Sequence, residues 1–425
     1  MKALVLGYGR SGKAAEALLK AQGTESVVLA DDERDRIEGE GFDFAVVSPG
    51  IALTHPWVVE AKRCGIPLKS ELQLGCETLK RQGWKLLAVT GSKGKSSVVK
   101  VVADAINLAG MEAVACGNYG VPVCEVAGDG AVTGMSPQTG WAVVEVSSFM
   151  METTELPGDT FEAAAILNLQ EDHLDRHGSV EVYHGLKRKL LGMTRHPVEA
   201  DGSLFDKRSG DTPHSASFGA RFARGICFSA LWKSSYFDNE ILAGNAAIAV
   251  ELMRVAGLDD ARIAAAFKAF KPLPHRMNLV AELDGVRYVD DSKATSLAAL
   301  IAGIRMASAT PQTLKPSNPQ TILLIAGGLP KGDDPKVALP ALTERVKKVY
   351  LIGQGAEAFF SAWKGAVDCE ICGTMDKAVE KAKREAEKGE TVLLSPGTAS
   401  FDQFQSYGER GEVFARLVKK EGQPK

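Results

Sequence analysis

The sequence has little of several features, and each absence excludes a class of protein. It has no apolar run near the ~18 residues that a membrane-spanning helix needs. Its start, Met1–Gly9, predicts a strand entering a glycine turn, not a signal peptide. It has no basic excess, because the formal net charge is −3, and general nucleic-acid binders usually have a basic surface. We therefore expect a cytoplasmic protein with no membrane or nucleic-acid partner.

Cysteine is also scarce, with 7 residues scattered over 425. An odd number in a long chain suits a reducing compartment. The single C-x-x-C, Cys369–Cys372, has no second pair and lies in a strand-like run, so it is not predicted to bind metal or to act in redox chemistry. The length predicts about two to four domains of ordinary, ordered composition.

The apolar runs alternate with helical patterns, which predicts an α/β protein. We divide the chain into three α/β units, residues 1–82, 83–272 and 273–425. The stiff segment Lys271–Pro274 is predicted to join the second unit to the third.

The segment 85–106 is the strongest functional signal. A buried strand over Leu86–Val89 precedes a small-residue turn and then a helix, so backbone N–H groups can surround a phosphate. Gly91 and Gly94 allow close approach of an anion, Lys95 can reach terminal phosphates and Ser96 can bind Mg²⁺. Val89 stands where the standard P-loop has its first glycine, so this loop is shorter. It predicts ATP or GTP binding; the alternative is a structural turn.

The first unit has a second glycine turn, Gly7-x-Gly9-x-x-Gly12, followed about 20 residues later by Asp31 and Asp32. This is the pattern of dinucleotide-binding sites, so an NAD-dependent oxidoreductase is a real alternative. A wider interpretation is that the turn binds some nucleoside diphosphate, and the simplest is a structural turn.

Further polar residues follow the predicted strands of the second and third units, where α/β proteins bind ligands. Glu145 ends one strand, and Asn168, Asp172 and His173 follow the next, which suggests Mg²⁺ near Ser96 and a second metal position. In the third unit the loops 290–295, 327–333 and 395–401 present lysines and hydroxyls that suit an anionic small molecule.

In order along the chain, these segments resemble the Mur ligases. The resemblance covers nearly the whole sequence and is carried by Ser48–Ile51, Thr90–Ser96, Gly117–Gly120, Glu145–Phe149, Asn168–Arg176, Leu273–Arg276, Asp291–Thr295, Gly327–Gly332 and Ser395–Phe404. The block that ends at Tyr407–Gly411 is similar to that of the family member that adds D-glutamate.

The resemblance implies three domains: a Rossmann-like N-terminal domain, a central P-loop-type ATPase domain with a parallel sheet, and a Rossmann-like C-terminal domain. It implies ATP-driven addition of D-glutamate to UDP-N-acetylmuramoyl-L-alanine through an acyl phosphate, in peptidoglycan precursor synthesis. ATP would be a co-substrate, two Mg²⁺ ions would assist, and the protein would be a monomer.

The family's site residues can be placed on this sequence one by one. The UDP-sugar would contact Arg10, Ser11, Asp32, Ser48, Gly50, Asn118 and Ser147. ATP would contact Gly91, Ser92, Lys93, Gly94, Lys95, Ser96, Ser97, Asn245 and Asp291. D-Glutamate would contact Lys293, Thr295, Lys331, Ser400, Phe401 and Tyr407, and His275 matches a further substrate- or nucleotide-contacting position. Ser96 and Glu145 would bind one Mg²⁺, and His173 with a carbamylated Lys187 the second, so that Lys95, Lys187, His173 and Glu145 carry the chemistry.

The sequence departs from the family pattern at Ile241–Leu242, where the family has a His-Asn pair on the adenine side. Besides the oxidoreductase, two alternatives remain. One is a sibling ligase, such as the alanine-adding enzyme or a folate polyglutamate synthase, and the other is a binding protein that keeps the fold without turnover.

Overall fold

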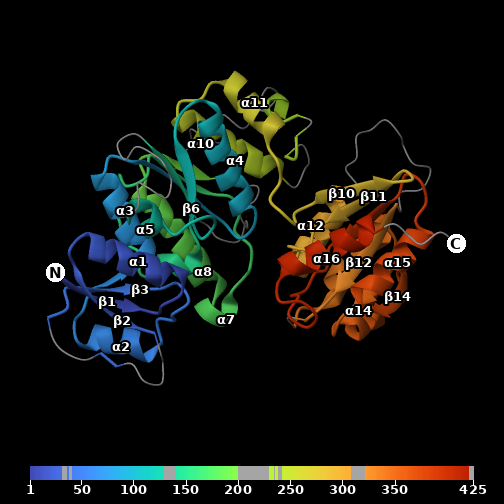
Figure 1. The fold of residues 1–425 in the computed structure, drawn as a ribbon, viewed down its shortest axis with the longest axis horizontal. Coiled ribbons are helices and arrows are strands. Elements are labelled where there is room, and N and C mark those ends of the chain that lie inside the picture. The colour runs from blue at the N-terminus through green and yellow to red at the C-terminus, as the bar shows by residue number, and fades with distance from the viewer. Residues whose placement is uncertain are drawn as a thin grey trace. The chain divides into compact units, whose positions relative to one another are not determined.

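The computed structural model describes residues 1–30, 36–37, 41–128, 140–199, 229–233, 235–237, 242–307, 321–330 and 332–420. The chain forms two compact units, Met1–Phe270 and Lys271–Lys425 (Figure 1). The described part of the first unit contains two sheets and that of the second contains one. Helices and largely parallel strands alternate along the chain, which confirms the predicted α/β class. The unit boundary falls at Lys271; the further division at 82/83 stays a prediction.

The N-terminal sheet has the strand order β2-β1-β3-β4, and all its strand pairs are parallel. Its elements are β1 Lys2–Leu6, α1 Arg10–Ala21, β2 Glu25–Leu29, β3 Phe44–Val47, α2 Pro56–Arg63, β4 Leu68–Ser70 and α3 Glu71–Arg81. The apolar runs of β1 and β3 are buried, as central parallel strands should be. Because β1 and β3 are neighbours, the turn after Leu6 lies beside the loop after Val47.

The central sheet has the order β6-β7-β5-β8-β9 and is also parallel. Its strands are β5 Lys85–Thr90, β6 Ala113–Gly117, β7 Trp141–Glu145, β8 Ala163–Ile166 and β9 Pro197–Glu199. Its helices are α4 Lys95–Leu108, α5 Val123–Gly128, α6 Ser148–Met151, α7 Leu174–His177, α8 Val180–Lys189, α10 Ala243–Val255 and α11 Asp260–Ala269, with 3₁₀ turns η1 Leu190–Met193 and η2 Ser229–Leu231. One apolar core runs through α1, α3 and α5 and joins the two sheets.

The sheet of the second unit has the order β10-β11-β15-β12-β13-β14, with only β10 antiparallel to its neighbour among the described strands. Its elements are β10 Asn278–Leu283, β11 Val286–Asp290, α12 Leu297–Ala307, β12 Ile322–Gly327, η3 Pro335–Ala338, α13 Leu339–Arg345, β13 Val346–Ile352, α14 Ala356–Trp363, β14 Asp368–Gly373, α15 Met375–Glu385, β15 Thr391–Leu394 and α16 Tyr407–Lys419. Separate apolar cores cover the two faces of the sheet. The strand order brings the loops after β11, β15 and β12 next to one another.

None of the described helices is long and apolar enough to cross a membrane. Cys369 and Cys372 lie in β14, in agreement with the strand-like run expected there.

Candidate functional site

The turn between β5 and α4 has the backbone shape of an anion site. Gly91 has φ +148° and Gly94 has φ +87°, in the region that favours glycine. A Cβ at Gly94 would lie 2.2 Å from Nδ2 of Asn245, in the first turn of α10, so a larger residue would have to displace that side chain. Gly94 is the N-cap of α4 and no described side chain caps that end. The first N–H groups of α4 are therefore open to an anion.

The same turn is held firmly by the loop that follows β8. Asn168 accepts a hydrogen bond from Lys93 N at 2.9 Å through Oδ1, and its Nδ2 donates to Lys93 O at 2.9 Å. The hydroxyl of Ser92 lies 3.0 Å from Gln170 O and 3.1 Å from the hydroxyl of Tyr183. These bonds fix the backbone path before any ligand arrives.

Two lysines converge on one oxygen of the turn. Lys95 Nζ donates to Gly91 O at 2.7 Å, and Lys187 Nζ, from α8, donates to the same oxygen at 3.0 Å. Lys187 is 1 % exposed, and burial, assisted by the charge of Lys95, lowers its pKa to about 7. The Lys95 ammonium at this oxygen will attract an anion bound at the turn, whereas Lys187, with its lowered pKa, is partly neutral near pH 7.

Glu145 ends β7 beside β5, where Val89 is its register partner. Its side chain is buried; Oε1 accepts a hydrogen bond from Asn118 Nδ2 at 2.7 Å. Its second oxygen, Oε2, is buried with no hydrogen-bond partner among the described residues. An open carboxylate oxygen in a buried position is costly unless a ligand completes it. Asn118, predicted to contact the UDP-sugar, here orients Glu145.

His173 lies just before α7 with φ +53°, an uncommon conformation for a non-glycine residue. Its ring packs edge-on against Phe149, with centroids 4.9 Å apart, and against Tyr183 at 6.0 Å. Burial lowers the pKa of His173, which favours the neutral imidazole that binds metals. Lys187 Nζ lies 4.5 Å from the ring centroid of Tyr183, so His173 and Lys187 both lie against this aromatic ring.

Mg²⁺ is the metal that the resemblance to the Mur ligases implies for this region. Among the described residues, no group of three or more His, Cys, Asp or Glu side chains is placed to hold a metal alone. The unpartnered Oε2 of Glu145 is nevertheless the kind of hard oxygen donor that Mg²⁺ binds, and Mg²⁺ usually shares its shell with substrate phosphates and water. The residues therefore fit a cation that a bound nucleotide completes. Ser96 is partly exposed at the start of α4, whereas Ser97 is buried.

The second glycine turn follows the carboxyl end of β1 in the N-terminal sheet. A Cβ on Gly12 would lie 2.0 Å from Gly7 O, and Ser48 Oγ donates to that same oxygen at 2.8 Å. The turn and the loop 48–51 are thus fastened together. Arg10 and Ser11 begin α1 there, and Gly50 is exposed beside Ser48. Asp32, another predicted contact of the UDP-sugar, lies outside the described residues. Ser147 caps α6 by accepting from Met150 N at 3.3 Å.

In the second unit the three predicted loops meet at adjacent strand ends. Asp291 Oδ2 accepts from Ser395 Oγ at 2.9 Å, which links the loops after β11 and β15. Burial raises the pKa of Asp291 to about 7. His275 Nδ1 lies 2.7 Å from Asp290 Oδ2, and Lys293 Nζ lies 3.9 Å from the ring centroid of Tyr407.

The other predicted D-glutamate contacts lie on the same loops. Thr295 is partly buried, Ser400 is buried and the side chain of Phe401 is 70 % exposed. Lys331 lies outside the described residues.

Arg410, on α16, lies outside every predicted site. Its guanidinium is fully buried and donates to Ser292 Oγ at 3.0 Å, Ser292 O at 2.9 Å, Thr398 O at 3.1 Å and Ala399 O at 3.2 Å. Burial lowers its pKa to about 10. Arg410 therefore holds two of the loops by their backbones.

Tyr183 was missed as well, although a signal exists. It stands four residues before Lys187 on one helix, a spacing that places both on the same face.

Two regions of the chain match family descriptions. Residues 89–200 match "Mur ligase middle domain", and residues 275–397 match "Mur ligase, glutamate ligase domain". Three curated relatives are each called UDP-N-acetylmuramoylalanine--D-glutamate ligase. The protein of Acidobacterium capsulatum is 33 % identical (98 % of this chain, 96 % of the relative), that of Chlamydia abortus 31 % (98 % and 97 %) and that of Dechloromonas aromatica 33 % (98 % and 98 %).

Solved structures share the fold at lower identity. UDP-N-acetylmuramate-alanine ligase of Thermotoga maritima matches with a TM-score of 0.56 at 15 % identity, covering 98 % of each chain. MurF of Acinetobacter baumannii matches with a TM-score of 0.57 at 14 % identity, covering 96 % of this chain and 98 % of its own. Family descriptions on both units and full-length relatives above 30 % identity lead to one conclusion: the chain belongs to the Mur ligase family.

Proposed function

We propose that this protein is an ATP-dependent amide ligase that adds D-glutamate to UDP-N-acetylmuramoyl-L-alanine. The observation that carries this choice is the likeness, over 98 % of the chain, to relatives that bear the D-glutamate ligase name. The fold alone does not select the substrate, because the solved structures at 14–15 % identity have names that point to different substrates.

The reaction joins a carboxylate to an amine, which needs activation. A carboxylate oxygen of UDP-N-acetylmuramoyl-L-alanine attacks the γ-phosphorus of ATP, so that an O–P bond forms and ADP leaves. The neutral amine of D-glutamate then attacks the acyl carbon, loses a proton and expels phosphate. The protein's task is to position these groups and to stabilise negative charge.

The turn Gly91–Ser97 and Asn245 are proposed to bind ATP. The open N–H groups of α4 point their positive ends at the phosphates. Lys95, which donates to Gly91 O here, is close enough to the turn to transfer its hydrogen bond to the γ-phosphate. It would then neutralise charge on the transferring group.

Mg²⁺ supplies charge neutralisation on the phosphates when it is bound. Ser96 and Glu145 are proposed to hold one ion, and His173 with Lys187 the second. The unpartnered Glu145 Oε2 supports the first assignment. Asn118 donates a hydrogen bond to the other carboxylate oxygen, Oε1, and so leaves Oε2 available to a metal ion.

Lys187 is proposed to act as its carbamate. A lysine reacts with CO₂ only as the neutral amine, forming an N–C bond and releasing a proton. Burial and the neighbouring Lys95 lower the pKa of Lys187 to about 7, so much of it is neutral near that pH. The carbamate would convert a buried cation, 3.0 Å from a carbonyl oxygen, into an anion able to hold a metal.

The remaining substrates are assigned to the other two sheets. The UDP-sugar is proposed to bind along Gly7–Gly12 and Ser48–Gly50, with Asp32, Asn118 and Ser147. D-Glutamate is proposed to bind at Lys293, Thr295, Lys331, Ser400, Phe401 and Tyr407. The cations among these residues would pair with its two carboxylates. Asp291 is proposed to contact ATP, and His275 a substrate or the nucleotide. The protein is proposed to act as a monomer, which light scattering after size-exclusion chromatography would test.

An amino-acid panel tests the proposal. Phosphate release is measured with ATP, Mg²⁺ and UDP-N-acetylmuramoyl-L-alanine, while D-glutamate, L-glutamate, L-alanine and meso-diaminopimelate are supplied in turn. Turnover with D-glutamate alone is expected. Turnover with L-alanine in preference to D-glutamate would instead identify a sibling ligase, and an absence of turnover with every amino acid would refute ligation.

A further inference from the structure

We propose that Arg176 is a positioning residue that holds the loop Ser48–Ile51 in register with the segment that carries His173. The proposal rests on the function proposed above, in which that loop binds the UDP-sugar. Arg176 lies on α7, three residues after His173, and belongs to the part of the unit built on the central sheet. The loop belongs to the N-terminal sheet.

The contacts of Arg176 join the two parts directly. Its Nη2 donates to Ile51 O at 2.8 Å and lies 3.5 Å from Pro49 O. The same guanidinium pairs with both carboxylate oxygens of Glu152, at 3.0 Å from Nε and 2.7 Å from Nη2. The side chains of Arg176 and Glu152 are only 16 % and 7 % exposed. One rigid, planar group thus fixes the loop to the segment after α6.

The connection continues on both sides of the guanidinium. On one side, Ser48 Oγ donates to Gly7 O at 2.8 Å, so the position of the glycine turn is linked to that of the loop. On the other, Glu152 Oε1 lies 3.4 Å from His177 Nδ1, and His177 Nε2 lies 3.0 Å from Ser148 Oγ. The guanidinium also lies over the ring of Phe149, which packs against His173.

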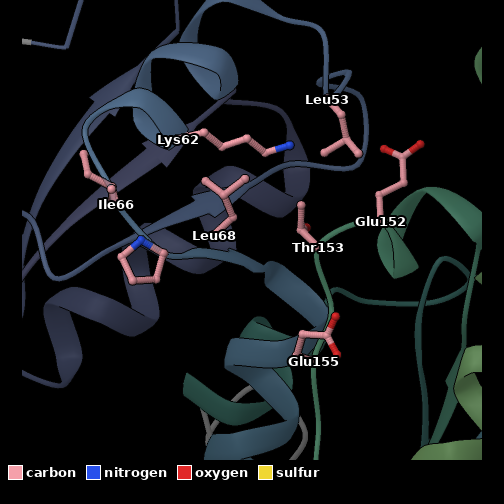
Figure 2. Close-up of a pocket in the computed structure, with 9 residues that line it drawn as sticks. Leu53, Lys62, Ile66, Leu68, Glu152, Thr153 and Glu155 are labelled. Carbon is pink, nitrogen blue, oxygen red and sulfur yellow. The ribbon is translucent and has the colours of Figure 1, made fainter.

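Apolar packing is interrupted beside this connection. A cavity beside Glu152 is lined by Leu53, Lys62, Leu68 and Glu155, among others (Figure 2). The cavity measures about 420 Å³. Close packing is therefore not continuous around Glu152, whereas the Arg176 hydrogen bonds reach the loop directly.

A buried ion pair of this kind contributes little net stability but can select one geometry. The chemistry needs that selection, because the sugar-linked carboxylate must stand about 3–3.5 Å from the γ-phosphorus to react. A loop displaced by one ångström would therefore reduce turnover while the ATP turn, held by Asn168, keeps its shape.

The test compares Arg176→Lys with Arg195→Lys in the full-length protein. Lysine keeps the charge, but one ammonium cannot bind both Glu152 oxygens and Ile51 O in a plane. Arg195 is the matched control, because it pairs with Asp159 and Glu162 on an exposed surface. kcat and KM are measured for UDP-N-acetylmuramoyl-L-alanine, together with Kd for an ATP analogue and the melting temperature.

We expect Arg176→Lys to lower kcat/KM for the UDP-sugar about ten-fold or more, with nucleotide Kd and melting temperature close to wild type. Glu152→Asp moves the partner carboxylate away from Arg176 and should also lower kcat/KM for the UDP-sugar. Arg195→Lys should leave that constant unchanged. Should Arg176→Lys fold poorly, the Glu152→Asp result decides. A kcat/KM within two-fold of wild type, or an equal loss of nucleotide affinity, would overturn the positioning role. Absence of wild-type turnover would instead refute the proposed function and this inference with it.

Discussion

The buried carboxyl of Glu71 makes folding stability depend on pH. Glu71 begins α3 and is 1 % exposed. Its Oε1 accepts from Cys124 N at 2.6 Å, and Oε2 has no hydrogen-bond partner among the described residues. Burial raises the pKa of Glu71 from 4.5 to about 7, against smaller opposing effects of the hydrogen bonds from Cys124. The folded protein therefore keeps this carboxyl protonated at pH values where the unfolded chain releases the proton.

The sign and size of the effect follow from the two pKa values. The pKa of Glu71 is higher in the folded protein than in the unfolded chain. The protonated carboxyl therefore contributes its full stability below pH 4.5, and this contribution is lost as pH rises through 7. The difference between a pKa of 4.5 and one of about 7 corresponds to about 3 kcal/mol in the free energy of unfolding. For a unit of this size, that is roughly 5 °C in melting temperature.

The assay is thermal unfolding of wild type and Glu71→Gln between about pH 5 and pH 8 at constant ionic strength. Glutamine stays neutral and can still accept from Cys124 N, so the variant should gain stability relative to wild type as pH rises. Glu77→Gln, on the same helix, is the control for replacing a carboxyl group by an amide. Asp291, also with a raised pKa, is common to all three proteins and cancels. Parallel pH profiles for wild type and Glu71→Gln would refute the reasoning.

Three further predictions concern the nucleotide turn. Lys187→Ala should abolish ligation but leave ATP affinity largely intact, as phosphate release and equilibrium nucleotide binding will measure; near-normal turnover would reject the carbamate. Glu145→Gln should raise the Mg²⁺ concentration needed for half-maximal turnover about ten-fold or more, since an amide oxygen is a weaker ligand; an unchanged Mg²⁺ titration would contradict its metal role. Gly94→Ala places a Cβ 2.2 Å from Asn245 Nδ2 at φ +87° and should weaken binding of an ATP analogue by at least about ten-fold, with wild-type affinity counting against a rigid turn.

The parts of the fold that local patterns encode could be predicted. The strand, glycine turn and helix at 85–108 follow from an apolar run, two glycines and a helix without proline. The three loops of the second unit were predicted to lie at strand ends, and the order β11-β15-β12 makes them neighbours. These features depend on short segments, which is why the sequence carries them.

The long-range polar contacts could not be predicted in the same way. Arg176 and Ile51 are 125 residues apart, and Arg410 and Ser292 are 118 apart. In the sequence both arginines look like ordinary surface residues of short charged segments. Their burial is decided by which strands become neighbours, and this depends on the packing of whole sheets.

Arg410 has a consequence for how this part of the molecule can be re-engineered. Three of its four hydrogen bonds end on backbone carbonyls, and only one ends on a side chain. The hydrogen bonds of Arg410 therefore depend on where the backbone carbonyls lie and very little on which side chains these loops carry. Segments grafted here from enzymes with another preference should be accepted whenever they place those carbonyls alike, whereas an insertion that shifts them would leave a charged group without compensation in the interior.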